Sequence, residues 1–398
     1  RNPKDFVRTI VNLETKRSIT KGEYIVSELT SGITRHKNMN VPIKEKEMLF
    51  NLWLCVAHNA KGILMWQFKP ERYTIEAGGC GLINMDGTEN YRTEEFKSFV
   101  KVFKDNEELF TNLKPVKGKI GLFYSMHSSI VASVNQMLNY QDAFHGASYI
   151  FWMNNIPFDI IRAGDNLKEY SIIYLPMPIC ISESGAKDLL EFVEAGGVLV
   201  SEAGLCSYKE NGFFSVRVPG YGFSDATGII EREIVPEDIL KIKTNFGEIY
   251  GLGERRFIEV FKDCEIIGEF EDKRPAILSC KYGSGRIIYL LTYPSLFYEK
   301  TGNTESLYVF YKLFNLEPEI RVTPQTGITC RLLRTHNDRR ILFVFNNLEK
   351  DVETYLHIEE KFKKIYPIFK NFSYIETISN STVKIYMGNK EVMILELI

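Results

Sequence analysis

The periodicity of apolar residues changes once along this chain, near residue 319, and this change limits the possible folds most strongly. Before it, short apolar runs alternate with amphipathic segments of helical spacing, as in β/α units. After it, only short strand-like segments remain, separated by turn residues. We expect these strands at residues 328–334, 340–346, 352–357, 382–386 and 391–397. The pattern predicts an α/β protein whose last domain, residues 319–398, is a small antiparallel β-domain.

Residues 1–115 read as a βα repeat with strands that look buried. Helical spacing and apolar runs alternate here, and Lys114-Pro115 breaks the pattern at a plausible domain boundary. Continuous apolar runs are typical of parallel strands covered on both faces. In chain order, we expect helices and strands at residues 5–19, 23–27, 44–59, 63–68 and 93–112.

Residues 116–318 form a second α/β region. Its alternating strands and helices predict an open, doubly wound parallel sheet of the flavodoxin-like type. The expected strands are 120–124, 158–161, 172–175, 198–200 and 285–291, and the expected helices are 140–154, 182–195 and 303–314.

Charge and cysteine content exclude several classes of function. The net charge of −2 offers no basic excess for phosphate binding, so we expect no nucleic-acid partner. No window is apolar enough for a membrane helix, so we expect no membrane partner. The seven cysteines are scattered without a CxxC pair. This favours free buried thiols in a reducing compartment and neither a metal nor another cofactor. The chain begins with Arg1 and not with a signal peptide, and the expected location is cytoplasmic.

Carboxylates and aromatic residues follow the first two expected strands. Glu28 ends the run at 23–27, Trp66 and Phe68 end the next strand, and Glu76 lies in the loop beyond. Loops that follow the strands of a (β/α)8 barrel build its active site. A sugar site uses such residues, because carboxylates accept hydroxyl hydrogen bonds or do chemistry while aromatic rings cover the apolar face of the sugar.

These segments resemble glycoside hydrolase family 42, the bacterial β-galactosidases. The segment S-E-L-T-S-G, residues 27–32, resembles the nucleophile segment of that family. The segment M-W-Q-F-K-P-E-R-Y, residues 65–73, followed by E-A-G-G-C-G-L, residues 76–82, resembles its next strand and loop. In that family a barrel precedes a flavodoxin-like trimerisation domain and a small β-domain, which is the order expected here.

The resemblance implies a role for each matching residue. Glu28 would be the nucleophile that attacks the anomeric carbon in a retaining, double-displacement hydrolysis of terminal non-reducing β-D-galactosides. Glu76 would bind galactose hydroxyls, and Trp66 or Phe68 would wall the sugar. Lys69 stands where the family often has arginine, and lysine keeps the charge but loses the bidentate fork. The resemblance also implies a β-galactoside substrate and a homotrimer.

One departure from the family pattern is large. The general acid/base glutamate of the family lies on an earlier barrel strand, usually in an Asn-Glu pair. Only the last two barrel strands precede the trimerisation region here, and Asn106-Glu107 comes after both strands and inside a helix. We therefore expect a C-terminal portion of a β-galactosidase that carries the nucleophile without the acid/base part. General acid/base help is worth ~10²–10⁴-fold in rate.

Other interpretations stay open at this point. Glu28 can be a solvated strand end, Glu76 can form a loop salt bridge with Arg72, and Trp66 and Phe68 can be core aromatics. The whole chain can be a non-catalytic module for oligomerisation and carbohydrate recognition. A flavodoxin-like binding protein is a third reading, but no phosphate-binding loop follows the strand at 120–124.

Overall fold

The structure is a computed structural model that describes residues 7–36, 39–73, 77–79, 81–135, 138–371 and 373–398. The chain divides into two compact units. Within the described residues, unit 1 joins Asn12–Val116 to Glu319–Ile398, and unit 2 joins residues 7–11 to Lys117–Pro318. Whether the two segments of unit 1 are separate domains, as the division at 115 and 319 suggests, stays a prediction.

Unit 1 begins with a parallel pair of strands. β1 (Tyr24–Thr30) follows α1 (Val7–Thr20), and β4 (Ala60–Trp66) follows α2 (Glu47–Ala57). The hairpin of β2 (Ile33–His36) and β3 (Met39–Pro42) lies between them in the chain. Then come α3 (Tyr91–Asp105), α4 (Glu107–Asn112) and β5 (Lys114–Pro115).

The expectation that β1 and β4 are fully buried is wrong. Ile25 is 62% exposed and Leu64 is 60% exposed. Within the described residues no third strand joins this pair, so one face and both edges lack cover. The open sheet with exposed apolar side chains is what a barrel reduced to two strands predicts.

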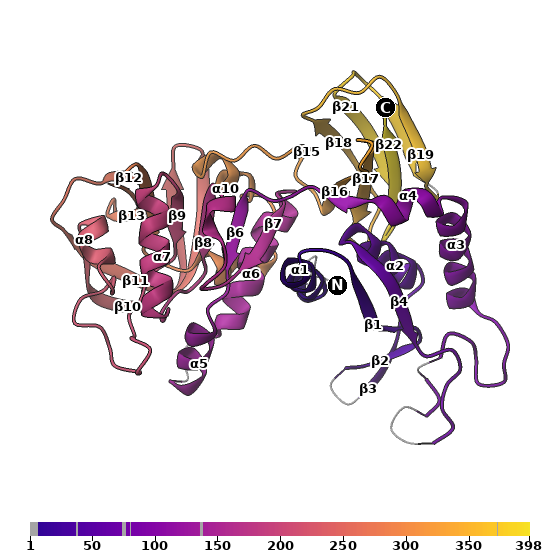
Figure 1. Cartoon of the computed structure of the whole chain (residues 1–398), viewed down its shortest axis with the longest axis horizontal. Coiled ribbons are helices and arrows are strands. Elements are labelled where there is room, and N and C mark those ends of the chain that lie inside the picture. Colours follow the sequence, from indigo (N-terminus) through magenta and orange to yellow (C-terminus); the bar gives the residue numbers. More distant parts are fainter. Residues whose placement is uncertain (1–6, 37–38, 74–76, 80, 136–137, 372) are drawn as a thin grey trace. The chain divides into compact units, whose positions relative to one another are not determined.

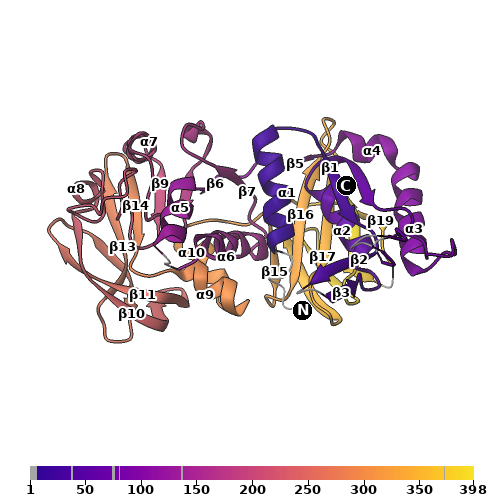
Figure 2. The same cartoon turned by 90° about the horizontal axis from the view of Figure 1, so that it is seen from below.

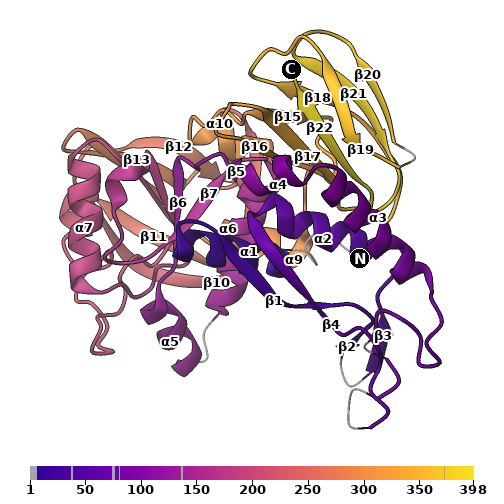
Figure 3. The same cartoon turned by 45° about the vertical axis from the view of Figure 1, so that its right-hand side comes forward.

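The C-terminal segment of unit 1, together with β5 of the first segment, forms two antiparallel sheets that face each other (Figure 3). Their shared core contains Val322 and Leu356 from one sheet and Leu342 and Leu395 from the other. The first sheet has the order β15-β18-β21-β20 and the second has the order β19-β22-β17-β16-β5. Their bounds are β15 (Ile320–Thr323), β16 (Ile328–Arg334), β17 (Arg340–Asn346), β18 (Val352–Ile358), β19 (Ile365–Phe369), β20 (Tyr374–Thr377), β21 (Thr382–Met387) and β22 (Val392–Leu397).

The helices of the first segment cover the outer face of the second sheet (Figure 2). Trp53 of α2 is fully buried, and its ring lies 6.4 Å from Phe343 of β17 and 5.5 Å from Phe369 of β19, centroid to centroid. Phe50 contacts Phe345 in the same way, at 5.3 Å. Because successive β17 side chains point to opposite faces, Leu342 fills the sandwich core while Phe343 packs on the helices.

A buried ion cluster adds a polar link inside unit 1. The Glu14 carboxylate of α1 lies 2.5 Å from Arg17 and 2.6 Å from Arg331 of β16, and 3.4 Å from Nε2 of His58. Burial alone raises the pKa of Glu14, but the charges of Arg17 and Arg331 hold it below its ordinary value. The carboxylate is therefore ionised and paired, which a fully buried charge requires.

Unit 2 is built on one nine-stranded sheet with the order β11-β10-β12-β13-β14-β9-β8-β6-β7 (Figure 1). The strands from β14 to β7 are parallel, in the order shared by doubly wound sheets. Their bounds are β6 (Ile120–Phe123), β7 (Phe158–Ile161), β8 (Ile172–Leu175), β9 (Val198–Ser201) and β14 (Gly285–Leu290). The helices are α5 (Met126–Val134), α6 (Tyr140–Met153), η2 (Leu167–Glu169), α7 (Glu183–Glu194), α8 (Phe223–Thr227), α9 (Pro294–Thr301) and α10 (Tyr308–Leu313).

An antiparallel extension of this sheet has no counterpart in the sequence-based expectations. It consists of β10 (Ile229–Thr244), β11 (Gly247–Val260), β12 (Glu265–Phe270) and β13 (Pro275–Tyr282). β10 carries many acidic and basic residues and Pro236, and most of its residues are not buried. Such a strand lacks the alternating or continuous apolar pattern that marks a strand in sequence.

Candidate active site

The C-terminal ends of β1 and β4 lie next to each other at one end of their sheet. Thr30 pairs with Trp66 and Leu29 pairs with Met65 in the parallel register. The register is irregular between Val26 and Leu29, a stretch that contains Glu28. β1 continues two residues past Glu28, so this carboxylate lies within the strand and not at its end. Such irregularities re-aim side chains near active sites, and Glu28 is exposed.

Ser31 ties the two motif segments together. Its backbone N–H donates to the Trp66 carbonyl at 2.9 Å, and its Oγ donates to the Gln67 carbonyl at 2.7 Å. Ser31 is fully buried. Sequence reasoning did not single out Ser31, although it lies within S-E-L-T-S-G, because only the pairing of β1 with β4 places the Gln67 carbonyl above it.

The aromatic residues of the second motif face solvent. Trp66 is 42% exposed and Phe68 is 68% exposed, so the alternative that they are core aromatics is wrong. The peptide bond between Trp66 and Gln67 is cis. The returning loop holds this segment, because Leu82 N–H donates to the Gln67 carbonyl at 2.7 Å and Ile83 N–H donates to the Phe68 carbonyl at 3.0 Å. These hydrogen bonds fix the backbone that carries the exposed rings of Trp66 and Phe68.

The loop packs closely at Gly81. A Cβ built on Gly81 would lie 2.1 Å from the ring of Pro70, so a glycine is required for this approach. Gly81 of the G-C-G-L motif therefore contacts Pro70 of the K-P-E-R-Y motif directly. The order of the two motifs in the sequence does not reveal this contact.

A polar pocket of about 620 Å³ lies among the loop residues that follow β4. Lys69, Arg72, Asn84, Met85 and Asp86 line it. Hydrogen bonds from Thr88 hold the pKa of the Asp86 carboxyl below its ordinary value, and the charge of Lys69 lowers it further. Two cations, one carboxylate and one amide are suited to binding polar groups such as hydroxyls. Of these residues only Lys69 was predicted to bind substrate, and Arg72 was named only as a possible salt-bridge partner, because loop polarity alone does not distinguish a pocket from a solvated turn.

Two candidate carboxylates have different outcomes. Glu76 lies outside the described residues, so its proposed contact with a sugar stays a prediction. Asn106 lies between α3 and α4, and Glu107 begins α4. The placement of this pair at a helix junction agrees with its rejection as the acid/base pair.

No group of three or more His, Cys, Asp or Glu side chains that could hold a metal ion occurs among the described residues. Likewise, none of the helices in the described ranges is long and apolar enough to cross a membrane.

Cys206 is fully buried, and burial raises the pKa of its thiol. A thiol in that environment is not a nucleophile, so the burial of Cys206 favours a structural role.

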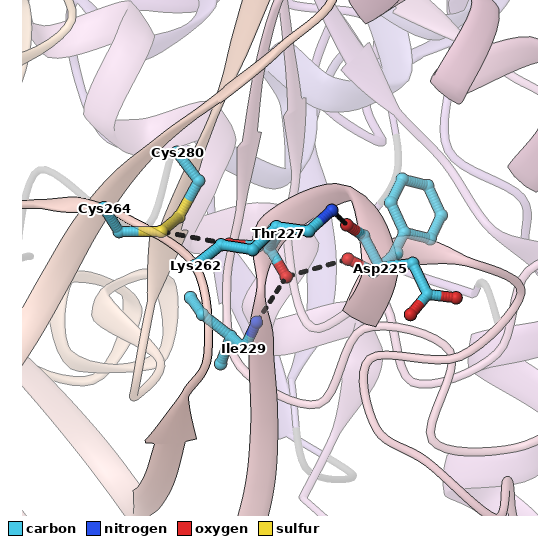
Figure 4. Close-up of a disulfide and its surroundings, with 7 residues drawn as sticks. Asp225, Thr227, Ile229, Lys262, Cys264 and Cys280 are labelled. Atoms are coloured by element: carbon cyan, nitrogen blue, oxygen red, sulfur yellow. Dashed lines mark hydrogen bonds between the residues drawn. A yellow bond between two sulfur atoms is a disulfide. The ribbon is translucent and has the colours of Figure 1, made fainter.

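The expectation that the cysteines are free thiols is wrong for one pair. Cys264 and Cys280 form a disulfide in unit 2 (Figure 4). Free and buried thiols are found at Cys55, Cys180, Cys206 and Cys330, as expected. The pair escaped sequence reasoning because its spacing matches no motif, and only strand pairing brings its sulfurs together.

Comparison with known proteins gives a family match for the middle of the chain. Residues 121–307 match the model of the β-galactosidase trimerisation domain. The β-galactosidase BgaB of Geobacillus sp. (strain Y412MC61) is 24% identical over 304 residues, covering 70% of this chain and 43% of that protein. The β-galactosidase LacZ of Lactobacillus acidophilus is 26% identical over 261 residues, covering 60% of this chain and 37% of that protein. The chain therefore spans less than half the length of these relatives.

Solved structures match the fold over the full length of the chain. Gan42B, a family 42 β-galactosidase, superposes with a TM-score of 0.82 at 17% identity, over 100% of this chain and 57% of that one. The β-galactosidase of Bacillus circulans sp. alkalophilus gives a TM-score of 0.81 at 18% identity, over 99% and 58% of the two chains. The chain thus resembles a C-terminal portion of a family 42 β-galactosidase, and the matches support a glycoside hydrolase family assignment.

Proposed function

We propose that the ends of β1 and β4 form the nucleophile side of a retaining β-galactosidase site. Glu28 attacks the anomeric carbon of a terminal β-D-galactoside and forms a covalent galactosyl-enzyme. Trp66 and Phe68 wall the apolar face of the sugar, and Lys69 and Glu76 bind its hydroxyls. The observation that carries the proposal is the pairing of Thr30 with Trp66, which brings both motifs to one sheet edge.

Neither β1 nor β4 carries a residue pair that matches the Asn-Glu acid/base pair of the family. A poor leaving group therefore has no proton donor when it departs, and water has no base when it attacks the galactosyl-enzyme. We infer that the chain corresponds to the last strands of a (β/α)8 barrel, followed by a flavodoxin-like domain at 116–318 and a β-domain at 319–398. Complete turnover needs the rest of such a barrel. We expect the protein to be cytoplasmic.

The test uses a substrate whose leaving group needs no proton. With 2,4-dinitrophenyl β-galactoside, we expect the full chain to release up to one equivalent of dinitrophenolate in a burst. Mass spectrometry of the trapped protein should then show a galactosyl group on the peptide that contains Glu28. With phenyl β-galactoside, whose leaving group needs protonation, we expect a rate lower by ~10²–10⁴-fold.

Two variants decide the role of Glu28. Glu28→Gln should lose the burst and the label. Glu23→Gln removes an exposed carboxylate just before the start of the same strand and should keep both. A burst that survives in Glu28→Gln would show that the proposed nucleophile is wrong.

The second candidate function is carbohydrate recognition without turnover. The exposure of Trp66 and Phe68 on an open two-stranded sheet favours it. Galactose binding that changes Trp66 fluorescence, without any burst in the wild-type chain, would establish this function in place of the enzyme.

A homotrimer is proposed from the trimerisation-domain match at residues 121–307. Exposed apolar side chains support association of unit 2, with Phe213 72%, Val216 99% and Ile239 55% exposed. Sedimentation equilibrium should give three times the chain mass of 46.0 kDa. A monomer at micromolar concentration would contradict this assembly.

A further inference from the structure

The disulfide of unit 2 links two neighbouring antiparallel strands. Glu265 of β12 pairs with Ser279 of β13, so the preceding residue Cys264 lies opposite Cys280. Their Cα atoms are 4.6 Å apart and their sulfurs are bonded (Figure 4). The bond closes the hairpin at the end away from its turn.

The two sulfurs differ in their access to solvent. Cys280 is 1% exposed, within a strand that pairs on both sides with β12 and β14. Cys264 is only half-buried, and it lines a pocket of about 580 Å³ whereas Cys280 does not. A reagent in this pocket therefore meets the Cys264 sulfur first.

Charged side chains of both signs surround that pocket. Lys281 and Arg286, which pair across β13 and β14, supply the cations, and Asp263 and Glu265 supply the anions. Within the described ranges, none of these four side chains forms an ion pair. A bound zwitterion would therefore displace only water from them.

The structure also provides a partner for Cys264 in the reduced state. Its Sγ lies 3.0 Å from the backbone carbonyl oxygen of Thr227, the last residue of α8 (Figure 4). A disulfide sulfur has no proton to donate, but a Cys264 thiol would donate its S–H to this oxygen. The segment before β12 thus has two tethers, one to β13 when oxidised and one to α8 when reduced.

We propose that Cys264 and Cys280 form a reversible disulfide and that the adjacent pocket admits a zwitterionic low-molecular-weight thiol, such as glutathione, to the Cys264 sulfur. Glutathione carries two carboxylates and one ammonium, which match the cations Lys281 and Arg286 and the anions Asp263 and Glu265. This proposal does not depend on the proposed catalytic function.

The exchange balances in two steps. The glutathione thiolate attacks the Cys264 sulfur, a new S–S bond forms, and Cys280 leaves as a thiolate that takes a proton from water. A second glutathione thiolate attacks the glutathione sulfur of this mixed disulfide. Oxidised glutathione leaves, the Cys264 thiolate takes a proton from water, and the resulting S–H donates a hydrogen bond to the Thr227 carbonyl oxygen. The protein disulfide is reduced, and two glutathione molecules are oxidised to one disulfide.

The test follows thiol exchange on the intact, folded chain. The oxidised protein is incubated with reduced and oxidised glutathione at varied ratios, quenched with acid, alkylated and mapped by mass spectrometry. We expect the reduced fraction to follow the ratio of [GSH]² to [GSSG] without denaturant. Cys280→Ser should accumulate a glutathionyl group on Cys264. Cys264→Ser should label Cys280 at least roughly tenfold more slowly, because that sulfur is buried.

Charge variants test recognition by the pocket. Lys281→Gln combined with Arg286→Gln should slow exchange with glutathione roughly 3- to 10-fold and leave exchange with uncharged 2-mercaptoethanol unchanged. Arg162→Gln combined with Lys168→Gln removes two exposed cations elsewhere in unit 2 and should change neither rate. Equal rates for all variants would overturn the recognition of a zwitterion.

Three other outcomes would overturn the reversible disulfide itself. These are two free thiols in protein treated with oxidised glutathione, a disulfide that reacts only after unfolding in urea, and preferential labelling of Cys280.

Discussion

Phe343→Ala tests whether residues 12–116 fold together with residues 319–398. Phe343 is fully buried in β17, with its ring 6.4 Å from both Trp53 and Phe110 of the first segment. Removing a buried phenyl ring loses its transfer free energy and leaves a cavity, at a cost of about 3–5 kcal/mol. If the two segments form one cooperative unit, the first segment loses that stability although the change lies in the second.

Tryptophan fluorescence during urea unfolding reports on the first segment directly. The chain has three tryptophans, so Trp66→Phe with Trp152→Phe leaves Trp53 as the single reporter. With a denaturant slope of about 2–3 kcal/mol/M, Phe343→Ala should lower the urea midpoint seen by Trp53 by roughly 1–2.5 M.

A matched change in unit 2 serves as the control. Phe310 is 1% exposed and packs against Tyr298 and Phe314. Phe310→Ala should destabilise unit 2 and leave the Trp53 midpoint in place. The reasoning is refuted if the Trp53 transition stays unchanged in Phe343→Ala while circular dichroism shows early loss of β-structure.

Three further predictions concern single buried sites. Glu14→Gln leaves the buried Arg331 without a full charge partner and should destabilise unit 1 by about 3–5 kcal/mol in urea unfolding. Burial raises the pKa of Glu202 from 4.5 to about 7, so its contribution to stability is fully present below pH 4.5 and is lost as the pH rises through 7, by roughly 3 kcal/mol. Glu202→Gln should remove this pH dependence, as measured by unfolding at pH 5 and pH 8. Gly146→Ala would place a Cβ 1.8 Å from the Ser295 carbonyl oxygen and should lower the stability of unit 2 by about 1–3 kcal/mol or more, measured by thermal unfolding.

Strands with a strong apolar pattern were predictable to their ends. The expected strands 328–334 and 340–346 are β16 and β17 with the same bounds. Their residues are buried on both faces, so packing enforces the same pattern that propensity favours. β10 and β11 show the opposite case. Their long pairing is held by backbone hydrogen bonds between residues most of which are not buried, and a sequence pattern does not report such bonds.

The candidate site was predictable as a pair of motifs but not as a geometry. The order of Glu28, Trp66 and Phe68 along two strands indicated one shared edge, and parallel pairing places the ends of those strands together. The hydrogen bonds of Ser31 and the pocket that Asp86 lines with Lys69 were not predictable, because the first needs β1 to meet β4 and the second needs the loop to return toward Lys69.

The sequence by itself determined which segments are helices and strands wherever burial dictates residue type. Tertiary structure decided how the segments combine. It joined residues 12–116 to 319–398 through the packing of Trp53 on Phe343, left β1 and β4 open, and brought Cys264 opposite Cys280. Contacts between residues distant in the chain depend on register and on which faces meet, and local periodicity carries no information about either.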